Sequence, residues 1–232
     1  MILISDELEY DIKPAKDDFQ AYLTNGAFYT NTMGYPILES WMILDSIPKR
    51  MVPFDKIKEV NDLSDCIICM YCNDASLNKI RKNPHLYLKN FSKAMGITGL
   101  DFSIFNDQPY AIQIYQMYSN LAYSYYYGLR HIPIVPNVRI GETAFSKEYF
   151  DAIPKGAIVS IGTYGFSKTK EEKNRQNKFV EELVESLRIK TILVYGSLTT
   201  YAKHILCVNN IKYYCYKPWI SIKDKGMLYD WN

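Results

Sequence analysis

The sequence predicts an α/β protein built on a mostly parallel sheet, and three observations support this fold class. From Arg50 onward, short apolar runs alternate with longer helical patterns, and the strand starts are spaced by roughly 20–35 residues, the size of a βα unit. The apolar runs do not alternate in polarity, as expected for strands covered on both faces. Hydrophobic residues make up 48% of the 232 residues and charged residues 22%, which suffices to bury a full core.

Six to seven βα units are expected from this pattern. We favour a small or incomplete (β/α) barrel, because a complete one usually needs about 250 residues. An open doubly wound sheet is the alternative. Residues 1–45 carry turn signals without a sustained period and are expected to form an N-terminal arm or cap. Residues 46–232 are expected to form a single α/β domain.

The expected strands are short and apolar, and the expected helices lie between them. The strands cover 51–54, 66–71, 99–105, 131–135, 157–161, 191–195 and 212–216. The helices cover 76–93 with a break near Pro84, about 109–127, 145–153, 171–187 and 198–206. Asp107 or Gln108 is expected to cap the second of these helices. Two adjacent apolar and aromatic stripes predict that this helix is largely buried.

Polar side chains recur at the ends of the expected strands, where both candidate folds place ligand groups. Asp101 is the most informative, because a carboxylate inside an apolar strand must be paired or face a site. Arg139 is its expected partner, and both are assigned as catalytic candidates, with a structural ion pair as the alternative. The expected ligand-binding residues are Asn73, Asp74, Ser103, Asn137, Thr163, Gly196 and Ser197.

Gly196 and Ser197 open a turn from a strand into a helix, where backbone N–H groups can approach an anion. An ordinary strand-to-helix turn is the alternative interpretation, because such turns use Gly and Ser anyway.

The cysteine spacing Cys66-x-x-Cys69-x-x-Cys72 is one seen in metal and iron–sulfur sites. The segment is an expected strand, however, so these thiols diverge toward opposite faces. We therefore expect no metal and no cofactor. The chain also lacks the H-E-x-x-H and G-x-S-x-G motifs, which argues against zincins and against the hydrolase elbow.

Charge and hydropathy bear on two further classes of protein, those that bind nucleic acids and those that span membranes. A net charge of +2 is too small to predict nucleic-acid binding by itself. A basic patch next to aromatic residues, as on nucleic-acid surfaces, comprises Lys79, Arg81, Lys82 and Lys89. A solvated helix face is the alternative. No apolar run approaches the ~18–20 residues of a membrane helix, and the first residues lack signal-peptide features, so we expect a cytoplasmic protein.

An ordered set of motifs resembles a known family. The set comprises Gly99-Leu-Asp-Phe-Ser-Ile-Phe-Asn-Asp-Gln-Pro109, Ile132-Pro-Ile-Val-Pro-Asn137, Phe150-Asp-Ala-Ile-Pro-Lys-Gly156, Val159-Ser-Ile-Gly-Thr163 and Tyr195-Gly196-Ser197. From about Val52 to Tyr216 the chain is similar to the domain of unknown function 4417 family, which phages, plasmids and integrated elements carry. The resemblance implies a mobile-element setting, with the host cytoplasm as the location, and no particular activity. Its motif positions are Asp101, Ser103, Asp107, Asn137, Gly162 and Gly196.

Three functions follow from these features. The first is an accessory protein that binds a small polar or phosphorylated ligand, nucleotide or sugar derived, at the strand carboxyl ends, with enzymatic activity left open. There Asp101 would act as an acid/base or sugar-hydroxyl ligand, and Arg139 would clamp an anion. The second is an interaction factor that inhibits or redirects a host or element protein, in anti-defence or replication. Its exposed aromatic anchors would be Tyr123, Tyr125, Trp219 and Trp231. The third is nucleic-acid binding through the basic patch.

Overall fold

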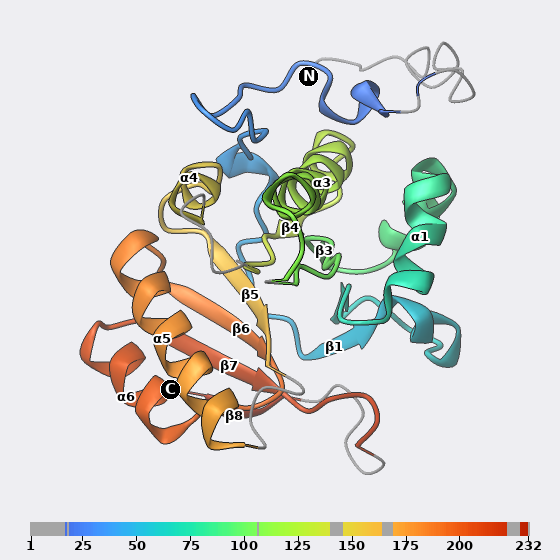
Figure 1. Cartoon of the computed structure of the whole chain (residues 1–232). Helices are drawn as coiled ribbons and strands as arrows, with labels where there is room; N and C mark the ends of the chain where they lie inside the picture. Colours follow the sequence, from blue (N-terminus) through green and yellow to red (C-terminus); the bar gives the residue numbers. More distant parts are fainter. Residues whose placement is uncertain are drawn as a thin grey trace.

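The computed structural model describes residue 17 and residues 19–105, 107–139, 146–163, 169–221 and 228–231. It confirms the α/β class, because parallel strands alternate with helices along the chain (Figure 1).

The strands form two sheets of four. The first contains β1 (Arg50–Pro53), β2 (Cys66–Cys69), β3 (Gly96–Thr98) and β4 (Ile134–Val135), all parallel. The second contains β5 (Ile158–Gly162), β6 (Thr191–Tyr195) and β7 (Lys212–Tyr216), all parallel, with β8 (Leu228–Trp231) antiparallel at its edge. The sequence pattern did not predict β8.

The helices follow the strands as βα units require. They are α1 (Asp74–Lys82), α2 (Leu88–Phe91), α3 (Tyr110–Leu129), α4 (Ser146–Asp151), α5 (Lys170–Ser186) and α6 (Thr200–Val208). Single 3-10 turns are η3 (Ala21–Thr24), η4 (Ser40–Met42), η5 (Phe54–Glu59) and η6 (Pro84–Tyr87). Helix α5 begins with a capping box, in which Thr169 and Glu172 bond to each other's backbone N–H groups.

Strand order separates the two predicted architectures. Within each sheet the strands lie side by side in chain order, whereas a doubly wound sheet reverses its order at a switch point. One isolated bridge, Asn137 to Ser160, joins the segment after β4 to β5. This sequential order is the order of a barrel. Closure is not confirmed, because the ladders among the described residues leave two separate sheets.

Both sheets contribute to a shared apolar cluster. It contains Met51, Ile67, Cys69, Val135, Leu193, Tyr195 and Tyr216 among its buried members. The Tyr216 hydroxyl also donates to the Pro48 carbonyl at 2.7 Å, which ties β7 to the segment before β1. The two sheets therefore pack on one another.

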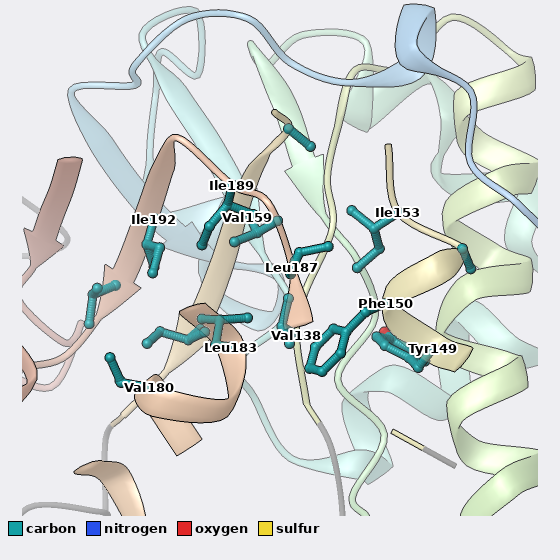
Figure 2. Packing of buried hydrophobic residues seen from close by; sticks show 14 of the residues in the cluster. Val138, Tyr149, Phe150, Ile153, Val159, Val180, Leu183, Leu187, Ile189 and Ile192 are labelled. Atoms are coloured by element: carbon teal, nitrogen blue, oxygen red, sulfur yellow. The ribbon is translucent and has the colours of Figure 1, made fainter. Parts of the chain in front are cut away.

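A second cluster lies between the β5–β7 sheet and its covering helices (Figure 2). Val180 and Leu183 of α5 pack there with Val159 and Ile192 of the sheet. Phe150 of α4 completes this layer. The amphipathic pattern of 171–187 thus describes a helix that covers one face of a sheet.

Helix α3 is buried mainly in its second half. Residues from Ser119 to Gly128 are all buried, whereas Tyr110 and Tyr115 near its start are exposed. The predicted burial is therefore correct for the second half of the helix. No helix within the described ranges is both long and apolar enough to cross a membrane.

The strand predicted over 99–105 is wrong. The third strand, β3, ends at Thr98, and the Gly99 N–H makes the last bond toward Val135. Beyond Gly99, backbone N–H groups bond side chains and no longer a neighbouring strand. Phe102 N–H donates to Asn120 Oδ1 at 3.0 Å, and Ser103 N–H donates to Asp74 Oδ1 at 3.3 Å. Asp101 accordingly lies in a loop that follows the strand.

The predicted cap of the helix that follows is also wrong. The N-cap position of α3 is Pro109, and no side chain caps it. Gln108 instead accepts a hydrogen bond from Phe105 N–H at 3.3 Å, within the loop.

The described part of residues 1–45 packs on the rest of the chain. Tyr35, Leu38 and Met42 belong to the apolar cluster that α5 covers. Leu44 N–H donates to Ile134 O at 2.9 Å, so this stretch runs beside β4. The division into an arm and a domain from residue 46 onward stays a prediction.

Candidate functional site

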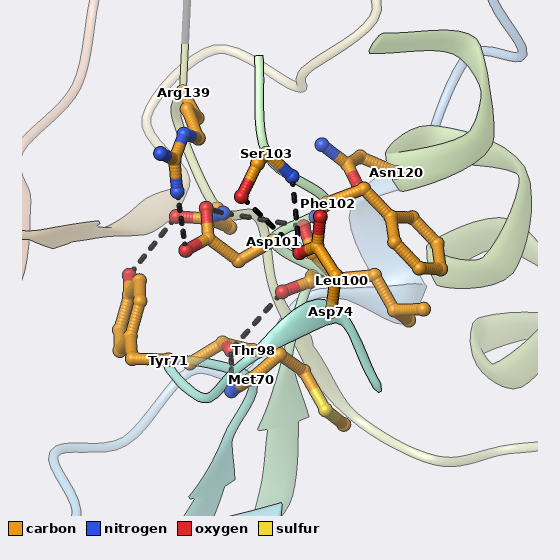
Figure 3. A network of polar contacts seen from close by, with 12 residues as sticks. Met70, Tyr71, Asp74, Thr98, Leu100, Asp101, Phe102, Ser103, Asn120 and Arg139 are labelled. Atoms are coloured by element: carbon orange, nitrogen blue, oxygen red, sulfur yellow. Dashed lines mark hydrogen bonds and ion pairs between the residues drawn. The ribbon is translucent and has the colours of Figure 1, made fainter. Parts of the chain in front are cut away.

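Asp101 and Arg139 form an ion pair at the carboxyl ends of neighbouring strands (Figure 3). The chain delivers Asp101 after β3 and Arg139 after β4, and these strands are paired in parallel. Arg139 Nη1 lies 2.8 Å from Asp101 Oδ2, with side-chain exposures of 30% and 11%. The predicted partnership of these two residues is confirmed.

Asn137 holds the other oxygen of the same carboxylate. Its Nδ2 donates to Asp101 Oδ1 at 2.8 Å and to the Leu100 carbonyl at 3.2 Å. Its Oδ1 accepts a hydrogen bond from the Tyr71 hydroxyl at 3.0 Å. The amide is buried, and both of its polar atoms are engaged. Asn137 therefore acts on the site by orienting Asp101.

Tyr71 connects this network to the second sheet. Its ring stacks on Tyr195 at the end of β6, with centroids 5.3 Å apart and planes 16° apart. A Cβ placed on Gly162 would lie 2.6 Å from the Tyr71 ring, so only glycine allows this approach. The residue pattern alone did not single out Tyr71. The sequence feature that could have identified Tyr71 is a tyrosine that follows a buried apolar strand.

Asp74 and Ser103 extend the network on its other side (Figure 3). Asp74 Oδ1 accepts hydrogen bonds from the Ser103 hydroxyl at 3.2 Å and from its N–H. Asn73 has a different task, because its side chain accepts from Ser76 N–H and caps α1. The structure thus brings together Asp74, Asp101, Ser103, Asn137 and Arg139, whereas the Asn73 side chain is used by a helix.

Burial sets the electrostatics of this site. Desolvation raises the pKa of Asp101, and the nearby Asp74 carboxylate adds to this effect. The Arg139 guanidinium and the Asn137 amide oppose it by favouring the charged form. Burial, followed by the Asp101 charge, also raises the pKa of Tyr71 well above its ordinary value, so its hydroxyl stays protonated and can donate to Asn137.

The raised pKa of Asp101 predicts a specific pH dependence of stability. Between the ordinary value of 3.8 and the raised value, the folded chain binds more protons than the unfolded chain. Stability contributed by this group therefore falls as pH rises through that window. Relative to Asp101→Asn, we expect the wild type to lose melting temperature as pH rises above 3.8 through the raised pKa of Asp101.

Asp65→Asn is the matched control, with the opposite sign. The hydrogen bond from Arg50 lowers the pKa of Asp65 below 3.8. Relative to Asp65→Asn, the wild type should therefore gain melting temperature as pH rises toward 3.8 and keep that gain at higher pH. Parallel pH profiles for the wild type and Asp101→Asn would contradict the assignment to Asp101.

Thr163, Gly196 and Ser197 lie at the ends of β5 and β6. Gly196 N–H donates to Tyr216 O at 2.9 Å and Thr163 N–H to Tyr195 O at 3.0 Å. These two backbone donors, including the one expected at Gly196, are therefore already used. The Thr163 hydroxyl is buried with no partner among the described residues. Within those residues, no hydrogen bond or ion pair joins this group to the Asp101–Arg139 pair.

The clustered cysteines diverge as the strand pattern predicted. Cys66 packs in the cluster that contains Phe54 and Phe91, and Cys69 in the cluster shared by the two sheets. Within the ranges that the structure describes, no group of three or more His, Cys, Asp or Glu side chains could hold a metal ion.

The basic patch is split by its environment. Lys79, Lys82 and Lys89 are exposed. Arg81 instead places its guanidinium 3.9 Å from the centroid of the Phe102 ring and bonds Gln116 at 2.9 Å. Nucleic-acid binding by this patch stays a prediction.

The expected aromatic anchors of a protein interface are wrong in part. Tyr123 and Tyr125 are each only 2% exposed. The Tyr123 hydroxyl donates to the Arg81 carbonyl at 3.1 Å, which joins α3 to α1. Trp219 is half-buried, and its indole N–H donates to Glu59 at 3.2 Å. The side chain of Trp231 lies outside the described residues.

Comparison with known proteins gives a family match and two phage relatives. The family model described as "Domain of unknown function (DUF4417)" matches residues 29–214. The Gene 1 protein of Mycobacterium phage D29 is 22% identical over 173 residues, which cover 72% of this chain and 64% of that protein. The Gene 1 protein of Mycobacterium phage L5 is 26% identical over 98 residues, which cover 42% and 43%.

The chain spans less than two thirds of the length of these curated relatives. No solved structure matches it.

Proposed function

The chain belongs to the domain of unknown function 4417 family, and from this premise we propose that it is a phage or mobile-element accessory protein that binds a small polar or phosphorylated ligand. The ligand, nucleotide or sugar derived, would lie at the strand carboxyl ends against Asp101 and Arg139. The phage origin of the two relatives supports the mobile-element setting. The host cytoplasm is then the place of action.

One observation carries the binding proposal: a mostly buried carboxylate is held in a fixed orientation beside a half-exposed guanidinium. A buried ion pair is weak evidence for stability, because apolar residues of similar volume often stabilise a fold as well or better. The pair also lies at the carboxyl ends of the strands β3 and β4. The carboxyl ends of parallel strands are where α/β folds bind their ligands.

Asp101 and Arg139 would contact different parts of the ligand. Asp101 accepts hydrogen bonds, and Asn137 with Tyr71 holds it in place. Arg139 gives one N–H to Asp101, and a guanidinium carries five such donors. Its remaining donors can bind an anionic group of the ligand, for which the planar fork of arginine is suited.

Thermal unfolding of the full chain tests the proposal. The probes are nucleoside mono-, di- and triphosphates and hexose and pentose phosphates. A probe present at about 100 times its Kd should stabilise the chain by about 2.7 kcal/mol and raise Tm. The Arg139→Gln variant should lose this rise. Arg50→Gln, which removes the arginine–aspartate pair with Asp65, should keep it. A panel without any rise, or an undiminished rise in Arg139→Gln, would contradict the proposal.

A further inference from the structure

The Asp101 carboxylate has hydrogen-bonding capacity left over. Each of its oxygens accepts one bond, Oδ1 from Asn137 and Oδ2 from Arg139, both at 2.8 Å. A carboxylate offers about four lone-pair positions, so about two stay open among the described contacts. The side chain is 11% exposed, so part of it is in contact with solvent.

The orientation of Asn137 keeps Asp101 an acceptor. Asn137 Nδ2 faces two acceptors, the carboxylate and the Leu100 carbonyl. Rotating the amide by half a turn would set its oxygen against both of these acceptors and its NH₂ against the Tyr71 hydroxyl. The Asp101 carboxylate and the Leu100 carbonyl therefore fix the amide with its NH₂ toward Asp101, and the Tyr71 hydroxyl donates to the oxygen on the other side. A ligand atom that meets Asp101 must accordingly bring its own hydrogen.

The local charge argues for a neutral donor. Asp74 is close enough to Asp101 to raise its pKa, and Arg139 is the cation paired with it. Among the residues that the structure describes at this point, two carboxylates and one guanidinium sum to one net negative charge. A phosphate pressed against Asp101 would be repelled, whereas a hydroxyl group would not. An anionic part of the ligand fits only on the outer side of Arg139.

We propose that Asp101 accepts hydrogen bonds from two adjacent hydroxyl groups of the ligand, so that the site recognises a sugar. The inference rests on the proposed function and specifies its ligand class. Two neighbouring hydroxyls on a sugar ring supply two O–H donors on one side, which matches the open capacity of one carboxylate. Asn137 and Tyr71 are positioning residues in this arrangement, because they act through Asp101.

Isothermal titration of the full chain with matched sugar probes tests the inference. The pairs are ribose 5-phosphate with 2-deoxyribose 5-phosphate, AMP with dAMP, and glucose 6-phosphate with 2-deoxyglucose 6-phosphate. At least one hydroxylated member should bind at least tenfold more tightly than its deoxy partner. In Asp101→Asn this ratio should fall to below about threefold. Asp65→Asn, which removes the carboxylate paired with Arg50, should leave the ratio unchanged.

The outcomes separate this inference from the proposed function. Equal binding of both members in every pair that binds would overturn the sugar assignment and leave ligand binding intact. No binding by any member would overturn both. Should Asp101→Asn fail to fold, Tyr71→Phe serves as the second variant, because it removes the hydrogen bond to Asn137 Oδ1 and so weakens the hold on the amide that orients Asp101. There the ratio should fall at least threefold while overall folding persists, and an unchanged ratio would count against the inference.

Discussion

Replacement of Asn137 by alanine should lower the free energy of unfolding by about 3–5 kcal/mol. The side chain is 2% exposed and its amide bonds three groups: the Tyr71 hydroxyl, Asp101 Oδ1 and the Leu100 carbonyl. Each buried group left without a partner costs about 1–3 kcal/mol. Chemical denaturation of the wild type and the variant, fitted with a common slope, measures the loss.

Asn120→Ala is the matched control, because it removes the same residue type at 1% exposure. Asn120 accepts one bond, from Phe102 N–H, and its Nδ2 has no partner among the described residues. We expect this variant to lose about 1–2 kcal/mol. Equal losses in the two variants would show that volume alone decides, and that the three bonds of Asn137 contribute nothing further.

The Tyr71→Phe and Asn137→Ala changes should also couple. Once Asn137 is absent, removal of the Tyr71 hydroxyl no longer takes away the hydrogen bond between these two side chains. The double variant should therefore be less destabilised than the sum of the single variants, by about 0.5–3 kcal/mol. Strict additivity would contradict the network.

The fold class was predictable because buried parallel strands leave a local signal. The runs Thr191–Tyr195 and Lys212–Tyr216 were predicted with the bounds that the structure has. The run 99–105 carries the same apolar signal and is a loop. Its N–H groups bond Asn120 and Asp74, side chains 18 and 29 residues away in the chain. The local pattern of polar and apolar residues cannot indicate hydrogen-bond acceptors that lie so far away in the chain.

The Asp101–Arg139 contact was predictable for a different reason. Successive parallel strands that are neighbours bring their following residues to one edge, and β3 and β4 are such neighbours. The role of Asn137 as a holder was not predictable, because it depends on Tyr71. Tyr71 in turn is held by Tyr195 of the other sheet. Its position follows from how two sheets pack, which strand patterns do not specify.

The expectation that Tyr123 and Tyr125 are exposed anchors was wrong. It rested on the preference of interface hot spots for tyrosine and tryptophan, and not on any signal for exposure. Tyr123 instead satisfies its hydroxyl inside the protein, with the Gln20 side chain and the Arg81 carbonyl. Because Gln20 and the Arg81 carbonyl of α1 bond the hydroxyl, burying this polar ring leaves no hydroxyl without a partner and costs little free energy.

Gly162→Ala should destabilise the fold by about 2–3 kcal/mol through overpacking. The new Cβ would lie 2.6 and 2.7 Å from two atoms of the Tyr71 ring, closer than atoms can approach without displacement. The ring has little freedom to yield, because it stacks on Tyr195 and its hydroxyl is bonded to Asn137. Ligand-induced stabilisation should fall as well, since displacing Tyr71 releases the amide that orients Asp101.

The steric origin of this effect can be isolated with a second substitution. In a Tyr71→Ala background the ring is gone, so adding Gly162→Ala should cost less than about 0.5 kcal/mol, because alanine is slightly favoured over glycine in a strand. Gly34→Ala is the control: a Cβ there meets nothing within 4 Å, but its φ is +66°. That variant should lose about 1 kcal/mol by backbone strain, in both backgrounds alike. If Gly162→Ala costs the same with and without the Tyr71 ring, the close approach between the two sheets does not explain the glycine.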